Sequence, residues 1–208
     1  MFVADDAEVR RPRLRRREWA YVGCEGGGRA LARFGGCGSV RYYAGVATVL
    51  GTGTRLRPMR LHEIEALAAS IPETTASQLA NRWREQGLGY RELLAAVREG
   101  ELVGTVSIAE TERPRRALHL FALEVVEGRR NEGVGGEIVA WVVEEARRRG
   151  RRRVFLEVRV DNPARRLYHR LGFRRVGPEF INAWWQFNDD GTQTRMEETS
   201  VRMVRRVF

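Results

Sequence analysis

The chain has 208 residues, 43% hydrophobic and 31% charged, so it can form one sizeable α/β domain and a further segment. Its formal net charge is +10, and all 37 basic residues are arginine. Without lysine there can be no Walker-type phosphate loop, pyridoxal Schiff base or kinase-type catalytic lysine. The charge favours an anionic partner, but a complete lack of lysine indicates compositional bias, so nucleic acid is not the expected main partner.

Metal chemistry and membrane insertion have no support in the sequence. The three histidines form no metal-binding pair, and Cys24 and Cys37 have no second pair nearby. No apolar run approaches the roughly 20 residues that span a bilayer, and none follows the N-terminal arginines as in a signal peptide. We therefore expect a metal-free, cytoplasmic protein that does not associate with membranes.

Residues 1–54 differ from the rest of the chain. They combine an arginine cluster with many glycines and show no hydrophobic periodicity, which disfavours regular structure. We expect a basic, glycine- and arginine-rich tail that is mobile or begins at a non-native start, with a short strand at residues 42–49. Residues 55–208 are predicted to form one domain.

Hydrophobic periodicity predicts the elements of this domain in chain order. Expected strands lie at residues 55–59, 93–97, 101–109, 116–126 and 154–160, from residue 173, and at 199–207. Expected helices lie at residues 61–71, 77–86, 135–149 and from 163 to Gly172, the last with Asn162 as N-cap. A turn is expected at residues 188–191. The pattern is a mixed sheet with helices against it.

Two glycine-punctuated segments are the strongest functional signal. Residues 130–136 read RNEGVGG and open a predicted helix, so backbone N–H groups, a positive dipole end and Arg130 together favour a pyrophosphate. The dinucleotide fingerprint G-x-G-x-x-G does not fit, because its third glycine would fall on Ile138. The alternative is a glycine-rich turn that only changes the direction of the chain and binds no ligand.

The second segment runs from Asn162 through Ala164, Leu167 and Tyr168 to residues 171–173, LGF. The two motifs, in this order and spacing, resemble the GNAT superfamily of N-acetyltransferases, as does the element order from residue 55. The resemblance implies an α+β, three-layer fold: a central mixed, mostly antiparallel sheet flanked by helices and splayed between its fourth and fifth strands. It also implies acetyl-CoA as co-substrate, no metal, and a small-molecule or peptide amine as acceptor, acting as monomer or homodimer.

The resemblance also implies roles for individual residues. The pyrophosphate would bind residues 130–136, and the pantetheine arm would pair with residues 123–126. The full set implied for co-substrate binding is Leu123, Val125, Val126, Arg130, Asn131, Glu132, Gly133, Val134, Gly135, Gly136, Asn162, Arg165 and Tyr168.

Tyr168 matches the phenol that protonates the departing thiolate, and a phenol with a pKa near 10 suits that task. Packing and helix capping are the alternative roles for Tyr168 and Asn162. Strict alternation along residues 118–125 would place His119, Phe121, Leu123 and Val125 on one face and Glu124 on the other. His119 and Glu124 are the candidate general bases, against the alternative of ordinary structural side chains.

Residues 180–198 contain two tryptophans and four acidic residues. They either line a pocket for a cationic amine or form a surface hairpin whose aromatic rings pack on the sheet. The expected function is acetyl transfer to a primary amine by direct attack on the thioester. The alternative is a module that senses acyl-CoA without turnover, or binds nucleic acid through the basic tail.

Overall fold

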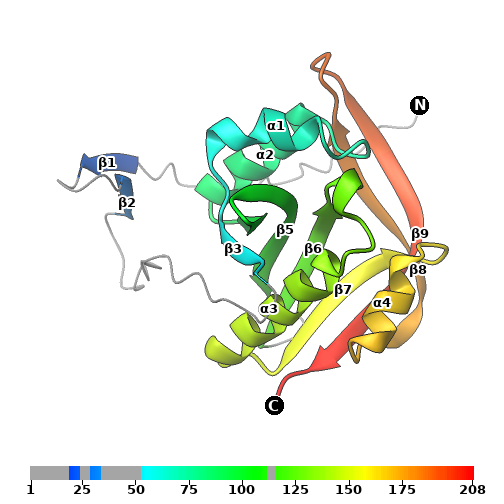
Figure 1. The fold of residues 1–208 in the computed structure, drawn as a ribbon. Helices are drawn as coiled ribbons and strands as arrows, with labels where there is room; N and C mark the ends of the chain where they lie inside the picture. Colours follow the sequence, from blue (N-terminus) through cyan, green and yellow to red (C-terminus); the bar gives the residue numbers. More distant parts are fainter. Residues whose placement is uncertain (1–18, 24–28, 34–52, 112–115) are drawn as a thin grey trace, which may run out of the picture. The chain divides into compact units, whose positions relative to one another are not determined.

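A computed structural model describes residues 19–23, 29–33, 53–111 and 116–208 (Figure 1). The chain divides into two units, Met1–Ala44 and Gly45–Phe208. In the first unit, β1 (Trp19–Gly23) and β2 (Arg29–Arg33) pair antiparallel, although no strand was expected there. The aromatic and β-branched residues of β1 favour a strand despite the surrounding glycines. The strand expected at residues 42–49 and both cysteines lie outside the described residues.

The second unit is built on a seven-stranded sheet with the order β3-β4-β5-β6-β7-β9-β8. Every neighbouring pair is antiparallel except β6 and β7, which are parallel. The element order from residue 55 confirms the predicted fold class, a mixed and mostly antiparallel α+β sheet. The strands are β3 (Arg55–Pro58), β4 (Glu92–Arg98), β5 (Glu101–Thr111), β6 (Ala117–Val125), β7 (Arg153–Arg159), β8 (Arg174–Phe187) and β9 (Gln193–Arg206).

Helices lie between several of the strands: η1 (Leu61–Glu63), α1 (Ile64–Ala68), α2 (Ala76–Gly87), η2 (Glu127–Arg129), α3 (Val134–Arg148) and α4 (Ala164–Arg170). The first predicted helix, at residues 61–71, is a short 3-10 helix followed by an α-helix that ends at Ala68. The α2 helix begins after Thr75, whose Oγ1 accepts a hydrogen bond from the backbone N–H of Gln78 at 3.0 Å. Pro163, and not the predicted Asn162, is the N-cap of α4; Asn162 lies one residue earlier, and its Oδ1 accepts from the N–H of Ala164 at 2.8 Å.

Helices pack on both faces of the sheet, as neighbouring residues of β4 show. Leu94 belongs to the apolar cluster that contains the core residues of α3, whereas Leu93 belongs to the cluster that contains those of α1 and α2. Successive side chains of a strand point to opposite faces. The sheet is therefore the middle of three layers (Figure 1).

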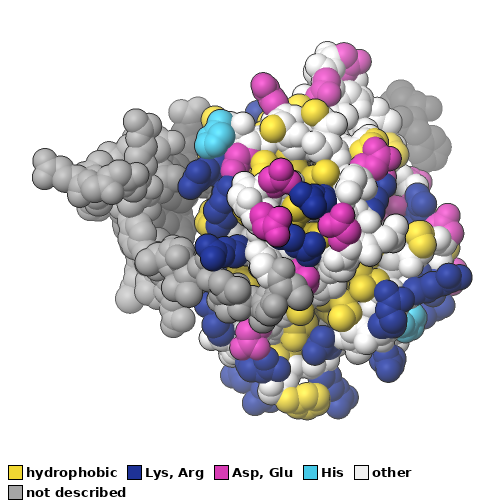
Figure 2. All heavy atoms as spheres, in the orientation of Figure 1, with side chains coloured by type: hydrophobic (Ala, Val, Ile, Leu, Met, Phe, Trp, Pro, Cys, Tyr) yellow, Lys and Arg dark blue, Asp and Glu magenta, His cyan; other side chains and the backbone are white. Residues whose placement is uncertain are grey.

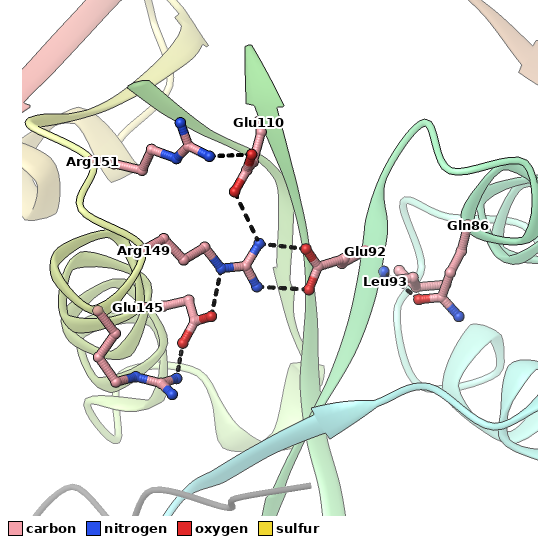
Figure 3. A network of polar contacts seen from close by, with 8 residues as sticks. Gln86, Glu92, Leu93, Glu110, Glu145, Arg149 and Arg151 are labelled. Atoms are coloured by element: carbon pink, nitrogen blue, oxygen red, sulfur yellow. Dashed lines mark hydrogen bonds and ion pairs between the residues drawn. The ribbon is translucent and has the colours of Figure 1, made fainter. Parts of the chain in front are cut away.

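An ionic network around the buried Arg149 side chain fastens the C-terminal end of α3 to the sheet (Figure 3). The Arg149 side chain, only 7% exposed, donates to both oxygens of Glu92 on β4, with Nη2 to Oε2 at 2.8 Å. Its Nε lies 2.5 Å from Oε1 of Glu145, whose side chain is 2% exposed. Arg151 binds Glu110 of β5, which also lies 3.9 Å from Arg149. Buried charges are costly unless paired, so these contacts depend on one another.

A β-bulge interrupts β6. Phe121 lies opposite Ser107 of β5, but Glu124 lies opposite Thr105, so β6 holds one more residue than its partner between these two pairs. Ala122 has a φ of +48°, a left-handed conformation that is unusual for a residue with a side chain. A bulge of this kind sends the following side chains to the opposite face.

The bulge overturns the predicted alternation along β6. Leu123 and Val125 do not share a face with His119 and Phe121; they pack against the apolar cluster of α3. Glu124 instead shares a cavity with His119 and Phe121. Strict alternation was wrong because one extra residue reverses the facing of every side chain after it.

The strands β6 and β7 separate along their length. Their parallel pairing covers only three positions, from Ala117 opposite Arg153 to His119 opposite Phe155. Beyond His119 both strands continue without pairing to each other, which is the predicted splay between the fourth and fifth strands of this sheet. The facing edges of the two strands therefore have backbone groups free for a ligand.

The last two strands form a hairpin longer than predicted. Both β8 and β9 have 14 residues, so most of residues 180–198 belong to the two strands and only residues 188–192 form the turn between them. Its tip contacts the start of α2: Thr75 Oγ1 donates to the carbonyl of Phe187 at 2.6 Å, and the N–H of Phe187 donates to Gln78 Oε1 at 2.8 Å. The hairpin thereby covers one side of the space between α2 and the sheet.

Candidate functional site

The first cavity lies where β6 and β7 separate, and its volume is about 910 Å³. The end of β6, the N-terminus of α3 and the helix α4 supply its walls. It brings together most of the residues predicted for co-substrate binding: Leu123, Val125, Arg130, Asn131, Gly133, Val134, Gly135, Gly136, Asn162 and Tyr168.

Three predicted binding residues lie outside this lining. Val126 packs against the apolar cluster of α1 and α2. Glu132 points toward arginines, with its Oε2 3.5 Å from Nη1 of Arg98. Arg165 donates through its guanidinium to the carbonyl oxygen of Val160.

The N-terminus of α3 opens onto the first cavity. The backbone reaches it through Asn131 and Gly133, with φ of +66° and +84°; Gly133 is suited to this left-handed conformation because it has no side chain. The first N–H groups of a helix have no partner within the helix, and its dipole is positive at this end. Gly135 and Gly136 have no side chains that would block a ligand from these backbone N–H groups. This end of the cavity is suited to an anion such as a phosphate.

Arg130 is held by two contacts at the rim of the first cavity. Its Nη2 lies 2.7 Å from Glu73 Oε2, and its Nε donates to the carbonyl of Val125 at 3.3 Å. The hydrogen bond from Arg130 also holds the pKa of Glu73 below its usual range. Arg130 thus joins the loop before α3 to the segment that leads into α2.

Tyr168 of α4 forms part of the wall of the first cavity. Its side chain is buried, and its ring meets Phe173 edge to face with a centroid distance of 6.0 Å. Burial raises the pKa of its phenol to about 12. The hydroxyl therefore keeps its proton throughout the neutral range, as a proton donor must before reaction.

The second cavity, of about 760 Å³, lies on the face of the sheet toward α2. The strand registers place Phe155 beside His119, Glu157 beside Arg202, and Glu198 beside Asn182, and side chains directly opposite each other share a face. Trp184, Trp185 and Phe187 of the hairpin also line it, so the predicted aromatic and acidic segment does border a pocket. The two cavities have in common Glu73, Phe121, Ala122, Glu124, Glu157, Asn162 and Glu198.

His119 lies inside a stack of aromatic rings. Its imidazole stacks on Phe121 at 4.6 Å and on Phe155 at 4.3 Å between ring centroids. Arg91 covers the outer face of Phe121 at 4.6 Å, and Arg202 approaches Phe155 at 5.4 Å. Burial and the positive charges of these two arginines lower the pKa of His119 to about 4, although a nearby carboxylate opposes the shift. The imidazole is therefore neutral at physiological pH.

Glu124 is held by partners on the neighbouring layer. Arg82 Nη1 donates to its Oε1 at 3.0 Å and its Oε2 at 2.9 Å, and Thr74 Oγ1 donates to Oε1 at 2.7 Å. The side chains of Arg82 and Glu124 are only 10% and 17% exposed. The pair connects α2 to the bulged part of β6, where the two cavities meet.

Several residues of the site were not predicted. Arg166 and Arg170 of α4 line the first cavity, and their four-residue spacing on one helix face was a signal for them. Glu157 and Arg82 gave no such signal, because their importance depends on strand register and on a contact between distant segments.

The described surface carries charges of both signs. Figure 2 shows acidic and basic side chains intermingled over the face in view. No helix of the described residues is long and apolar enough to cross a membrane. Within the same residues, no group of three or more His, Cys, Asp or Glu side chains is arranged to hold a metal ion.

Sequence comparison identifies relatives among acetyltransferases. A model of the acetyltransferase (GNAT) family matches residues 59–173. N-acetyltransferase 8 of Rattus norvegicus is 28% identical over 130 residues, which cover 61% of this chain and 55% of the relative. N-acetyltransferase 8B of Homo sapiens is 32% identical over 95 residues, covering 44% and 42%. The chain thus spans about half the length of the curated relatives it matches.

Solved structures share the fold at low sequence identity. The ribosomal-protein-S18-alanine N-acetyltransferase of Escherichia coli superimposes with a TM-score of 0.54 at 18% identity, covering 74% of this chain and 94% of its own. YncA of Salmonella typhimurium, solved with its cofactor acetyl-CoA, gives 0.53 at 17% identity, covering 75% and 95%. The family match extends over more than half of the sequence and contains both glycine-punctuated segments. The chain therefore belongs to the acetyltransferase (GNAT) family, whose members use acetyl-CoA.

Proposed function

We propose that residues 55–208 catalyse transfer of an acetyl group from acetyl-CoA to a primary amine, by direct attack of the amine on the thioester. The separation of β6 from β7 above the N-terminus of α3 carries this proposal. The free edge of β6 is suited to pair with the amides of a pantetheine arm, and the helix N-terminus with a pyrophosphate. Arg166 and Arg170 add positive charge to the same cavity.

The acceptor would enter through the second cavity and meet the thioester where the two cavities join. Its neutral nitrogen attacks the carbonyl carbon, so a C–N bond forms as the C–S bond breaks. The departing thiolate takes the proton of the Tyr168 hydroxyl, which solvent then replaces. The nitrogen loses one proton, which leaves an N-acetyl amine and free coenzyme A.

Two residues were predicted as acceptors of that proton, and their surroundings differ. Glu124 lines both cavities, whereas His119 lines only the second and its Nε2 is buried without a partner among the described residues. We therefore place Glu124 nearer the reacting nitrogen. In this role Arg82 and Thr74 orient its carboxylate.

Calorimetric titration with acetyl-CoA, followed by assay of thiol release with a pool of amines, tests the proposal. We expect micromolar donor binding and thiol release that depends on an amine. Replacing Arg166 and Arg170 together by Gln should weaken donor binding about tenfold, the scale of two solvent-screened phosphate contacts. Arg84→Gln, an exposed position on α2 that lines neither cavity, is the matched control. No binding at millimolar acetyl-CoA would refute the proposal.

A further inference from the structure

The charges around the second cavity are nearly all neutralised by neighbours. Five carboxylates line it, and four of them have an arginine partner. The four pairs are Glu73 with Arg130 at 2.7 Å, Glu85 with Arg91 at 2.5 Å, Glu124 with Arg82 at 2.9 Å, and Glu157 with Arg202 at 2.6 Å.

Glu198 is the exception among these described residues. Among the residues that the structure describes, no arginine lies within ion-pair distance of its carboxylate, which accepts one hydrogen bond, from Ser200 Oγ to Oε1 at 3.0 Å. Glu198 is half-buried on β9 and lines both cavities, so it lies at the junction where an acceptor meets the donor. A half-buried carboxylate without a counter-ion favours a cation as its ligand.

Aromatic side chains surround the same position. Asn182 of β8 lies directly opposite Glu198 of β9. Trp184 follows Asn182 by two residues, so its side chain lies on the same face of the hairpin as that of Glu198. Phe121 lines the cavity from β6, but His119 and Arg91 already cover its ring, so it adds apolar surface only. The face of Trp184 can attract a cation, and both rings can bury the apolar body of an amine.

The two arginines of this cavity are already engaged. Arg82 binds Glu124, and Arg91 binds Glu85 and covers the ring of Phe121. A carboxylate on the acceptor would therefore find no free cation among the described residues that line the second cavity, and would lie near the charge of Glu198. An acceptor with both an ammonium and an adjacent carboxylate is disfavoured by this arrangement.

From these contacts we infer that Glu198 is the specificity-determining residue for the acceptor, and that the acceptor is a monocationic primary amine with an aromatic or apolar body and no adjacent carboxylate. This inference rests on the proposed function. The ammonium form binds Glu198 and then loses a proton to solvent, which gives the neutral amine that attacks.

The test compares 2-phenylethylamine with phenylalanine, which has the same body plus a carboxylate, and with the uncharged 2-phenylethanol. We expect 2-phenylethylamine to be acetylated with a kcat/KM at least tenfold above that of phenylalanine, and 2-phenylethanol to inhibit only weakly. Glu198→Gln should raise the KM for 2-phenylethylamine about tenfold to a hundredfold with kcat within about threefold, the scale of one charged hydrogen bond. Binding of 2-phenylethylamine to the coenzyme A-loaded protein should weaken by the same factor.

Glu197→Gln is the matched control, because Glu197 is the neighbouring exposed residue on β9 and pairs with Arg195. It should leave KM unchanged. Equal use of phenylalanine, equal inhibition by 2-phenylethanol, or a Glu198→Gln variant with an unchanged KM would overturn the inference. So would a fall in kcat at constant KM. Failure of the proposed function would give another result: acetyl-CoA would not bind, and no amine would cause thiol release.

Discussion

The neutral state of His119 should make the stability of this protein depend on pH in a defined window. The unfolded chain binds a proton on this histidine below its ordinary pKa of 6.5, whereas the folded protein does so only below about 4. Stability from the buried neutral ring is therefore complete above pH 6.5 and is lost as the pH falls toward 4. Linkage over this gap gives about 2 kcal/mol between pH 7.5 and pH 4.5, after allowing for the part of the ring that stays exposed.

The assay is urea unfolding at the two pH values, monitored through tryptophan fluorescence. His119→Phe keeps an aromatic ring between Phe121 and Phe155 but cannot bind a proton. We expect the wild type to lose about 2 kcal/mol more than this variant on acidification. His169→Phe, at an exposed position on α4, controls for the loss of a histidine and should behave as the wild type does. Parallel losses in the wild type and His119→Phe would refute a buried neutral imidazole.

Three further outcomes test other parts of the structure. Tyr168→Phe should lower kcat about 10- to 1000-fold with donor binding unchanged in calorimetry, and unchanged turnover would leave Tyr168 only a packing role. Gly104→Ala should destabilise the bulged region and weaken donor binding, because the new Cβ would lie 2.5 Å from the carbonyl oxygen of Glu124. Urea unfolding measures the stability and calorimetry the donor binding, and wild-type values in these assays would contradict the close approach. Arg149→Met should cost about 2 kcal/mol in urea unfolding, since it removes the buried guanidinium that binds Glu145 and Glu92, whereas the exposed Arg147→Met should cost under about 1 kcal/mol. Equal losses would show that the network contributes little.

The parts of the fold that could be predicted are those with local signals. The order of helices and strands follows from hydrophobic periodicity, and the start of α4 close to Asn162 follows from the asparagine side chain and the proline after it. Strand β9 was expected to begin six residues late, at Thr199 and not Gln193. The outer part of its hairpin is an exposed sheet edge, where alternation of polar and apolar residues is weak.

The parts that could not be predicted depend on contacts between distant segments. Nothing near Ala122 in the sequence marks it as the site of a bulge, so Glu124 was assigned to the wrong face. Its partner Arg82 lies 42 residues away on another layer. The predicted glycine loop, by contrast, needs only its own backbone and the helix after it, and this is why most of its residues lie together in the first cavity.

The contact between α2 and the tip of the β8–β9 hairpin also has a consequence for folding. Thr75 and Phe187, which make it, are 112 residues apart in the chain, so the entropy of closing that loop must be paid before the contact forms. Contacts of such high sequence separation form late in folding. The first cavity is built mainly from the continuous stretch between residues 120 and 170 and does not need this closure. Local opening of the hairpin tip would therefore expose the second cavity to solvent while the first keeps its shape.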